Sequence, residues 1–208
     1  MLNYIYKSLE NFRGVFSRSS TWLIFCLVML AFMGNGNIIG VSSFCRFWGI
    51  GESGYHSILH FFRSSGWSLN LLVIYWGNFV LSQKKTVCIN GRTVLIGDHT
   101  YVPKDGCKMP GVVSLHQDSE TQSKPSYFRG HCWGAVGVLI GSITAPFCIP
   151  LSLAIHQVFI HIEEESNCKN GDKLTMGIRL IKMAIDFSVR ENKPVVMILD
   201  AFSRRSCF

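Results

Sequence analysis

The spacing of apolar residues changes near residue 85, and this change divides the chain into two parts of different secondary structure. Before it, apolar residues recur every three or four positions, which is the period of an amphipathic helix. After it, short runs rich in β-branched residues follow one another, with an Asn-Gly pair between the first two. We therefore expect an all-helical region over residues 1–85 and a sheet-containing α/β domain over residues 86–208.

Positive charge is concentrated in the first part of the chain. Residues 1–97 contain 8 Lys and Arg against 2 Asp and Glu, whereas residues 98–208 contain 12 against 11. The excess of +6 in the first segment indicates a polyanion or an anionic membrane surface as its partner. The 8 cysteines form no Cys-x-x-Cys pair, so neither a zinc site nor a disulfide framework is indicated, and a reduced, cytoplasmic setting is expected.

The uninterrupted apolar run over residues 22–33 is the strongest membrane signal in the chain. It is about 12 residues long, whereas a membrane-spanning helix needs about 20, and glycine and asparagine residues follow it directly. We expect a buried core helix here and regard membrane association as unlikely to be the chain's role. A cleaved signal, or an anchor formed by residues 22–41, remains the alternative.

Two short helical patterns in the first part have the spacing of a helix-turn-helix motif. They cover residues 38–48 and 53–63 and are separated by a Gly-Ile-Gly turn. The expected inward face of the second pattern consists of Tyr55, Ile58, Leu59 and Phe62. On its outer side, His56, His60 and Arg63 follow at i, i+4 and i+7, and such a basic face is typical of a helix in the major groove of DNA. The same three residues also fit the solvated face of an ordinary helical bundle.

The second part begins with a predicted β-hairpin. Residues 86–89 and 92–98 are two β-rich runs joined by Asn90 and Gly91, which favour a tight two-residue turn. The polar segment over residues 101–129 shows no clear period and is expected to be a long loop, of a length that is often functional.

The rest of the second part predicts two strands, a helix and a last strand. The strands cover residues 131–144 and 147–162, the helix residues 172–190, and the last strand residues 195–199. The apolar residues at helical spacing are Leu174, Ile178, Ile181, Ala184, Ile185 and Val189, with Arg179, Lys182 and Arg190 on the outside. This order predicts three connected strands, a crossover helix and a strand that returns to the centre of the sheet.

Two aspartates each follow an apolar run: Asp98 follows residues 94–97, and Asp200 follows residues 195–199. If the two strands are neighbours, the carboxylates face each other at one edge of the sheet and can hold a divalent metal ion. Such ions activate the nucleophile and stabilise the leaving oxygen when a phosphodiester is cut. An aspartate at a strand end also often caps the next turn, so the pattern alone leaves a structural role open.

An ordered set of residues follows Asp98. It consists of Lys104, Gly106, Met109, Pro110, Gly111, Leu115, His116, Ser119, Ser123, Lys124, Gly130 and His131. In this order the set resembles the first-Asp block of bacterial DDE transposases of the insertion-sequence-four-like group. Residues 40–67 resemble the helical DNA-binding region of that family, and residues 199–202 resemble its second-Asp block.

The resemblance implies a DNA transposase with a ribonuclease H-like mixed sheet, preceded by an all-helical DNA-binding region. Asp98 and Asp200 would be its first and second catalytic, metal-binding acids, with Mg²⁺ or Mn²⁺ as cofactor. The implied partner is double-stranded DNA at transposon ends, with a homo-oligomer as an option and no small-molecule substrate, in a DNA-associated cytoplasmic location. The basic residues of the segment after Asp98 would place positive charge beside the phosphate to be cut; they are Lys104, Lys108, Lys124 and Arg129. They also fit a solvated basic loop.

The family's third acid is a glutamate on a helix well beyond the second aspartate, whereas this sequence ends at Phe208. The glutamates at 163–165 fall in a predicted turn and are expected to be solvated charges. We therefore expect an incomplete ribonuclease H-like domain in a truncated transposase that does not cleave DNA by itself. A non-catalytic DNA-binding fragment is the alternative, and a membrane-anchored protein is a third hypothesis.

Overall fold

The computed structural model describes residues 2–34, 36, 40–83, 85–104, 109, 111–116, 127–155 and 176–199. Within these residues the chain is a mixed α/β protein with two units, Met1–Phe79 and Val80–Phe208. The boundary between the units follows residue 79, inside a helix, whereas the sequence suggests a boundary after residue 85. Each unit is described by itself.

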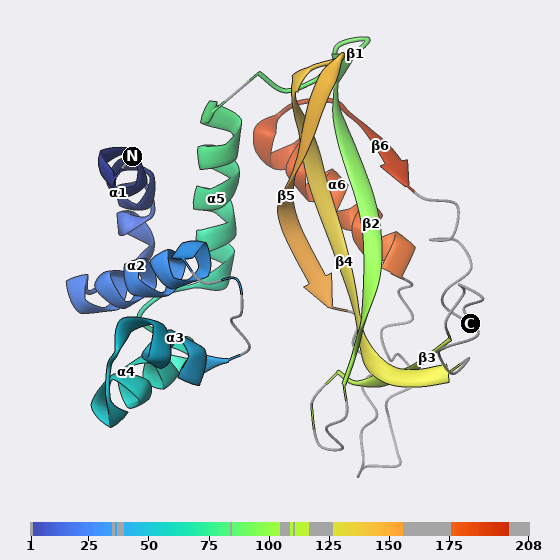
Figure 1. Ribbon diagram of the computed structural model, residues 1–208. Coiled ribbons are helices and arrows are strands. Elements are labelled where there is room, and N and C mark those ends of the chain that lie inside the picture. Colours follow the sequence, from blue (N-terminus) through green and yellow to red (C-terminus); the bar gives the residue numbers. More distant parts are fainter. Residues whose placement is uncertain are drawn as a thin grey trace. The chain divides into compact units, whose positions relative to one another are not determined.

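The first unit is helical wherever the structure describes it (Figure 1). Its elements are α1 (Leu2–Glu10), a 3₁₀ turn (Arg13–Val15), α2 (Ser19–Gly34), α3 (Val41–Trp48), α4 (Glu52–Arg63) and α5 (Leu69–Gln83), the last of which crosses the unit boundary. The helical prediction for this part is confirmed, because apolar side chains at helical spacing pack into a shared core.

An aromatic cluster forms the larger core of the helical unit. Its fully buried members are Leu9, Phe12, Val15, Phe16, Phe25 and Phe61. The ring centroids of Phe16 and Phe25 lie 4.9 Å apart, and Phe61 stacks on Trp67 at 5.3 Å with an interplanar angle of 13°. Aromatic pairs at such distances add about 0.5–1.5 kcal/mol each to the burial of their area.

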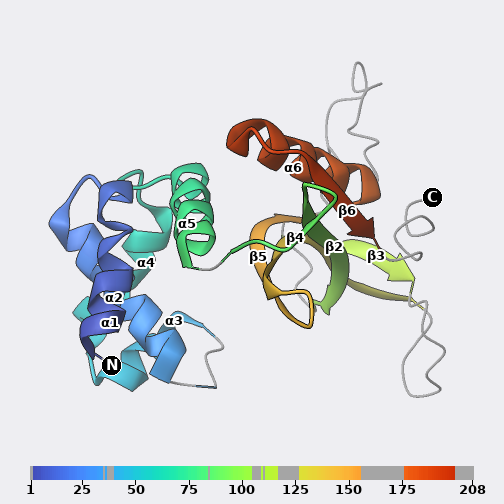
Figure 2. The same ribbon diagram turned by 90° about the horizontal axis from the view of Figure 1, so that it is seen from above.

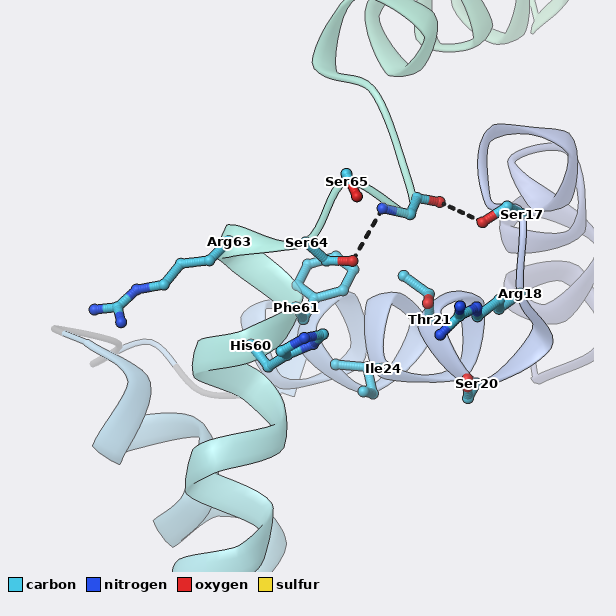
Figure 3. A pocket seen from close by; sticks show the side chains of 11 residues that line it. Ser17, Arg18, Ser20, Thr21, Ile24, His60, Phe61, Arg63, Ser64 and Ser65 are labelled. Atoms are coloured by element: carbon cyan, nitrogen blue, oxygen red, sulfur yellow. Dashed lines mark hydrogen bonds between the residues drawn. The ribbon is translucent and has the colours of Figure 1, made fainter.

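Polar contacts join the start of α2 to the turn after α4 (Figure 3). The hydroxyl of Ser17 donates to the Gly66 carbonyl at 3.1 Å, and the Gly66 amide donates to Ser64 Oγ at 3.0 Å. In the same turn the Trp67 indole N–H donates to the Phe61 carbonyl at 2.9 Å. These bonds hold the end of α4 against the beginning of α2.

The apolar run predicted to be a core helix forms α2 and is buried on one face only. Phe25, Val28 and Ala31 are buried, whereas Leu23 and Met33 are more than half exposed. The prediction of a buried helix therefore holds for one face and is wrong for the other. No helix in the part of the chain that the structure describes combines the length and the hydrophobicity needed to cross a bilayer.

In its described residues the second unit contains a six-stranded sheet, the helix α6 and the end of α5. Its elements are β1 (Cys88–Ile89), β2 (Arg92–Pro103), β3 (Val113–His116), β4 (Tyr127–Ser142), β5 (Ala145–Ile155), α6 (Met176–Glu191) and β6 (Val195–Leu199). The hairpin of β1 and β2 turns at Asn90 and Gly91, whose φ angles of 50° and 74° confirm the predicted Asn-Gly turn.

The order of strands follows from shared pairing partners. Gly130 in β4 pairs with Pro103 of β2 and with Val113 of β3, so β2 and β3 lie on opposite sides of β4. Strand β5 pairs with the same stretch of β4 as β2 does, and therefore lies on the side of β3. On the outer side of β2 lies β6, which gives the order β5–β4–β2–β6 (Figure 1). The strand after the helix pairs with the first long strand, but it lies at the edge of the described sheet and not at its centre, where the sequence had placed it.

Helix α6 covers one face of the sheet (Figure 2), and two glycines make room for it. A Cβ atom at Gly134 would lie 2.4 Å from Met176 Sδ, and one at Gly97 would lie 3.6 Å from Leu180 Cδ1 and 2.4 Å from Met197 Cε. A side chain at Gly134 would therefore displace the Met176 side chain of α6, and one at Gly97 would displace the Met197 side chain of β6.

Leu174 lies outside the described residues, and apart from Ala184 the predicted packing face of α6 is wrong. Its buried residues are Met176, Leu180, Ala184 and Phe187, whereas Ile178, Ile181, Ile185 and Val189 are 41–76% exposed. Both sets recur at helical spacing, so the sequence pattern alone selects neither of them. The sheet selects the set that contains Met176 and Leu180, whose side chains fill the space above the glycines.

The predicted loop over residues 101–129 is also shorter than expected. Strand β2 continues to Pro103, β4 begins at Tyr127, and β3 lies between them. Ladder hydrogen bonds to β4 override the weak strand signal of these polar residues.

Truncation of Leu180 tests which face of α6 packs on the sheet. Because Leu180 is fully buried, Leu180→Ala is expected to lower the free energy of unfolding by about 2–5 kcal/mol. Ile181→Ala, one residue further along the helix and 46% exposed, is expected to change it by less than about 0.5 kcal/mol. Urea unfolding of both variants measures the difference, and a larger loss in Ile181→Ala would contradict the packing described here.

Candidate metal site and nucleic-acid interface

Asp98 lies within a strand and not at the end of one. It is the seventh residue of the 12-residue strand β2, and its backbone pairs with Ala135 of β4. The sequence had placed it at a strand end, and the continued pairing of β2 with β4 up to Pro103 corrects that expectation. The Asp98 side chain is exposed, and its Oδ1 accepts a hydrogen bond from the His99 backbone amide at 2.7 Å.

Asp200 lies outside the described residues, but the strand before it is described. Strand β6 runs parallel to β2, and its last residue, Leu199, pairs with Gly97. Leu199 and Gly97 immediately precede Asp200 and Asp98 in the sequence. The strand that contains Asp98 and the strand that precedes Asp200 are therefore adjacent, and the proximity of the two carboxylates stays a prediction.

The Asp98 side chain is on the sheet face that α6 does not cover. Gly97 faces Leu180 of α6, and successive residues of a strand point to opposite faces. Asp98 therefore shares the other face with Ile96 and with Ala135, its partner on β4. The surroundings of the carboxylate on this face are apolar and open, since Ile198, which pairs with Ile96, is 51% exposed.

The described part of this site contains one carboxylate, that of Asp98, of the kind that could bind a metal ion. An exposed carboxylate on a rigid central strand is the donor that Mg²⁺ and Mn²⁺ prefer. Among the described residues there is no group of three His, Cys, Asp or Glu side chains that could hold an ion. Asp200, the second acid predicted for this site, lies outside the described residues.

The predicted basic residues of the segment after Asp98 are only partly described. The Lys104 amide donates to the Arg129 carbonyl at 2.9 Å, so the two residues lie side by side where β2 ends. Both are six positions along their strands from the pair formed by Asp98 and Ala135, which corresponds to about 20 Å. Lys108 and Lys124 lie outside the described residues.

Two histidines near Asp98 turn toward the interior of the protein. His131 is 7% exposed, with its ring centroid 6.2 Å from that of Trp133. His99, which the sequence did not single out, places its ring 5.3 Å from the Tyr101 ring, and its Nδ1 atom is buried without a hydrogen-bond partner among the described residues.

The helix-turn-helix spacing in the first unit is observed as two helices around a glycine turn. Helix α3 ends at Gly49, which adopts the left-handed conformation with φ of 63°, and α4 begins after Gly51. The Ile50 amide donates back to the Cys45 carbonyl at 3.0 Å, which closes the last turn of α3. A second core cluster, consisting of Val28, Ala31, Phe44, Cys45 and Ile58, packs α3 and α4 against α2.

Helix α4 is rotated relative to the face predicted for it. Ile58 and Phe61 are buried, whereas Tyr55 is 37% and Phe62 is 48% exposed. The prediction that Tyr55 and Phe62 face inward is wrong. Phe61 stacks on Trp67 in the aromatic core, so the side of α4 that carries Phe61 is the buried one.

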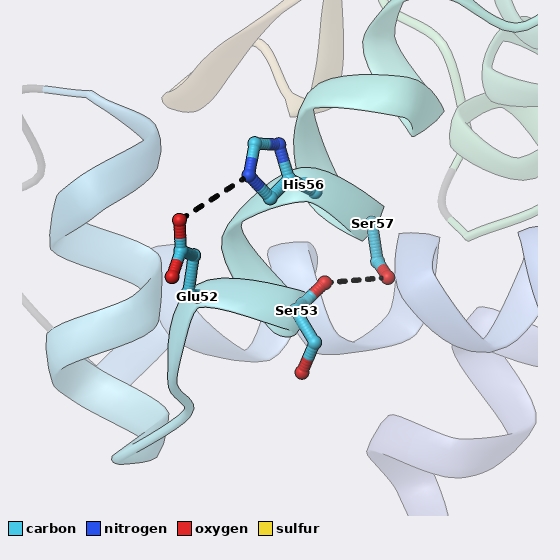
Figure 4. Close-up of polar contacts among 4 residues, drawn as sticks. All are labelled: Glu52, Ser53, His56 and Ser57. Carbon is cyan, nitrogen blue, oxygen red and sulfur yellow. Dashed lines mark hydrogen bonds and ion pairs between the residues drawn. The ribbon is translucent and has the colours of Figure 1, made fainter.

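The predicted basic row on α4 is exposed. His56, His60 and Arg63 are all accessible to solvent. The Nε2 atom of His56 lies 3.8 Å from Oε1 of Glu52, which is one helical turn earlier, and both side chains are exposed to solvent (Figure 4). Residues 1–79 contain 5 Lys and Arg against 2 Asp and Glu, so the helical unit itself carries +3, and the rest of the early positive charge lies after it.

Comparisons with protein-family models, with curated proteins and with solved structures found no match to this chain. Its function therefore has to follow from the geometry of its own residues.

The left-handed turn that orients α4 is open to a direct test. A Cβ atom would meet no other atom within 4 Å at either Gly49 or Gly51, but only Gly49 has a positive φ. Gly49→Ala is therefore expected to lower the free energy of unfolding by about 1–2 kcal/mol. Gly51→Ala should change it by less than roughly 0.5 kcal/mol, because the weaker N-cap is offset by a less flexible unfolded chain. Equal losses in thermal or urea unfolding would contradict the turn.

Proposed function

We propose that this chain is a DNA transposase of the DDE type, in which the sheet unit carries the metal-dependent phosphodiester site and the helical unit binds DNA. The pairing of Gly97 with Leu199 carries the proposal. These two residues are paired on adjacent parallel strands. In the sequence they are followed directly by Asp98 and Asp200, the two acids that resemble those of the family.

The topology of the sheet supports this assignment. Strands β2, β4 and β5 are antiparallel neighbours in succession, and after α6 the strand β6 joins the outer side of β2 in parallel. A ribonuclease H-like fold is built in this way, and we propose that the sheet is of this type. Few arrangements of a mixed sheet place the strand after the helix beside the first long strand.

The proposed chemistry assigns a limited task to the residues of this chain. Asp98 and Asp200 would hold Mg²⁺ or Mn²⁺, which when bound activates the attacking oxygen and stabilises the leaving one. Asp98 is fixed for this task because its backbone is paired on the β4 side and adjoins the β6 ladder at Gly97. A ligand on a central strand keeps its position, and such rigidity is what transition-state stabilisation requires.

A second candidate function is DNA binding without catalysis. The exposed row of His56, His60 and Arg63 favours it, because this row requires no metal and lies in the unit without the carboxylate site. The two candidates differ in whether the protein binds a divalent metal through Asp98.

Metal binding distinguishes the two candidates. Asp98→Asn and Asp200→Asn each keep the size of the side chain and remove one anionic ligand, so each is expected to weaken Mn²⁺ binding about tenfold or more. Asp186→Asn, which changes an exposed acid on α6, is the matched control and should leave the affinity unchanged. Water proton relaxation or electron paramagnetic resonance measures free and bound Mn²⁺. Equal affinities in all three variants would remove the metal site and leave the non-catalytic function.

DNA binding by the helical unit should depend on salt and on Arg63. Arg63→Gln removes one cation from the exposed row and is expected to reduce the slope of log affinity against log salt by about 0.9 on a short random-sequence duplex. Lys193→Gln removes an equal charge from an exposed position in the sheet unit and should leave the slope unchanged. Fluorescence anisotropy at several salt concentrations gives both slopes. If the unaltered chain does not bind duplex DNA at low salt, DNA recognition by this unit is wrong.

A further inference from the structure

The helical unit contains a cavity of about 480 Å³, and two residues of the predicted basic row on α4 belong to its lining (Figure 3). Its walls are the start of α2, the last turn of α4 and the turn that follows α4. Cavities of this size hold small ligands or parts of larger ones.

Three basic side chains line this cavity. Arg18 comes from the start of α2, and His60 and Arg63 come from the end of α4. In Figure 3 the side chains of Arg18 and His60 extend toward the hollow from the two helices, whereas the Arg63 guanidinium is turned outward at its rim. Among the described residues, no hydrogen bond or ion pair occupies these three side chains, and no acidic residue lines the cavity.

The remaining polar lining consists mainly of hydroxyl groups. Ser20 and Thr21 lie on the first turn of α2, and Ser64 and Ser65 lie on the facing turn after α4. Hydroxyl groups donate hydrogen bonds to oxyanions, as they do at the phosphate contacts of nucleic-acid-binding proteins. The cavity thus combines positive charge with donors, without an acidic neighbour to repel an anion.

The shape of the cavity is fixed by hydrogen bonds between its two walls and by the aromatic core. Both the backbone amide and the hydroxyl of Ser17 donate to the Gly66 carbonyl at 3.1 Å, which joins the two walls across 49 residues of sequence. Phe61, which with Ile24 forms the apolar part of the lining, belongs to the aromatic core and stacks on Trp67. A site that is held in shape before binding loses little conformational entropy when its ligand arrives.

We infer that this cavity is a phosphate-binding site and that, in the complex with DNA, it receives one phosphate group of the backbone. The inference rests on the proposed DNA binding by the helical unit and adds the place where the backbone is held. His60 and Arg63 belong both to the exposed row on α4 and to the cavity, so a strand that follows the row reaches the cavity at its end. The volume leaves room for the sugars on either side of the phosphate.

The test uses the full chain and two variants on facing walls, Arg18→Gln and His60→Gln. Each is expected to weaken binding of a random-sequence duplex about three- to tenfold, and Arg18→Gln should also reduce the salt slope by about 0.9. Lys7→Gln removes one exposed positive charge from α1, outside the cavity, and is the matched control. Circular dichroism and thermal unfolding check that each variant keeps its fold.

A second measurement separates free phosphate from the DNA backbone. Inorganic phosphate at constant ionic strength should shift the amide resonances of Ser64, Ser65 and Gly66 in the unaltered chain but not in Arg18→Gln. If DNA binds equally well to the unaltered chain and to Arg18→Gln, the cavity does not hold the backbone, although the proposed DNA binding stands. If phosphate shifts the resonances but DNA does not bind at all, the site is one for free phosphate, and DNA recognition by this unit is overturned. If the binding of neither DNA nor inorganic phosphate depends on Arg18, the proposed phosphate site is wrong.

Discussion

The sheet unit depends on the parallel ladder between β2 and β6, because this ladder brings together parts of the chain that lie about 100 residues apart in sequence. Thr93 to Gly97 pair in register with Val195 to Leu199, and α6 connects this ladder to the antiparallel strands. Helix α6 packs closely on the sheet at Gly134 of β4, because Met176 and Leu180 take the space that a Cβ atom would fill there.

The ladder has a chemical consequence through the alternation of side chains. Gly97 faces α6, so Asp98 faces the opposite side of the sheet, and the same register brings β6 beside it up to the residue before Asp200. Two consecutive residues thus have different roles. Gly97 lies on the face that packs against the helix, and Asp98 provides the proposed carboxylate on the open face. If β2 shifted by one residue relative to its partners, Gly97 would point to the open face and Asp98 toward α6. Both the helix packing and the proposed carboxylate site would then be lost.

In the helical unit the aromatic cluster has the corresponding role. Phe61 is buried and stacks on Trp67, and this contact decides which edge of α4 enters the core. The same contact leaves His60 and Arg63 on the accessible side and holds the turn after α4 near the start of α2. The exposed basic row and the cavity are therefore two results of one packing event. The cavity draws residues from two separate segments, 17–24 and 60–66, which is why no local motif marks it.

Local signals in the sequence determined the features that need only a few neighbouring residues. Asn90 and Gly91 specify a tight turn because both adopt positive φ angles with little strain, and the turn is observed. The helical pattern of residues 53–63 and the apolar run of residues 195–199 likewise formed the helix and the strand that they predict. The order of helix and strands limited the topology, because a strand after a crossover helix returns beside a parallel partner.

Tertiary structure decided every question that a periodic pattern leaves open. Helix α6 has two apolar stripes, and only the fit of Leu180 over the sheet glycines shows which of them is buried. Strand β2 continues past Asp98 because β4 offers it hydrogen-bond partners as far as Gly130, so the acid lies inside a strand that the sequence appeared to end. Period and turn chemistry are properties of the chain alone, whereas the choice of face and the extent of pairing depend on the surface that a segment meets when the chain folds.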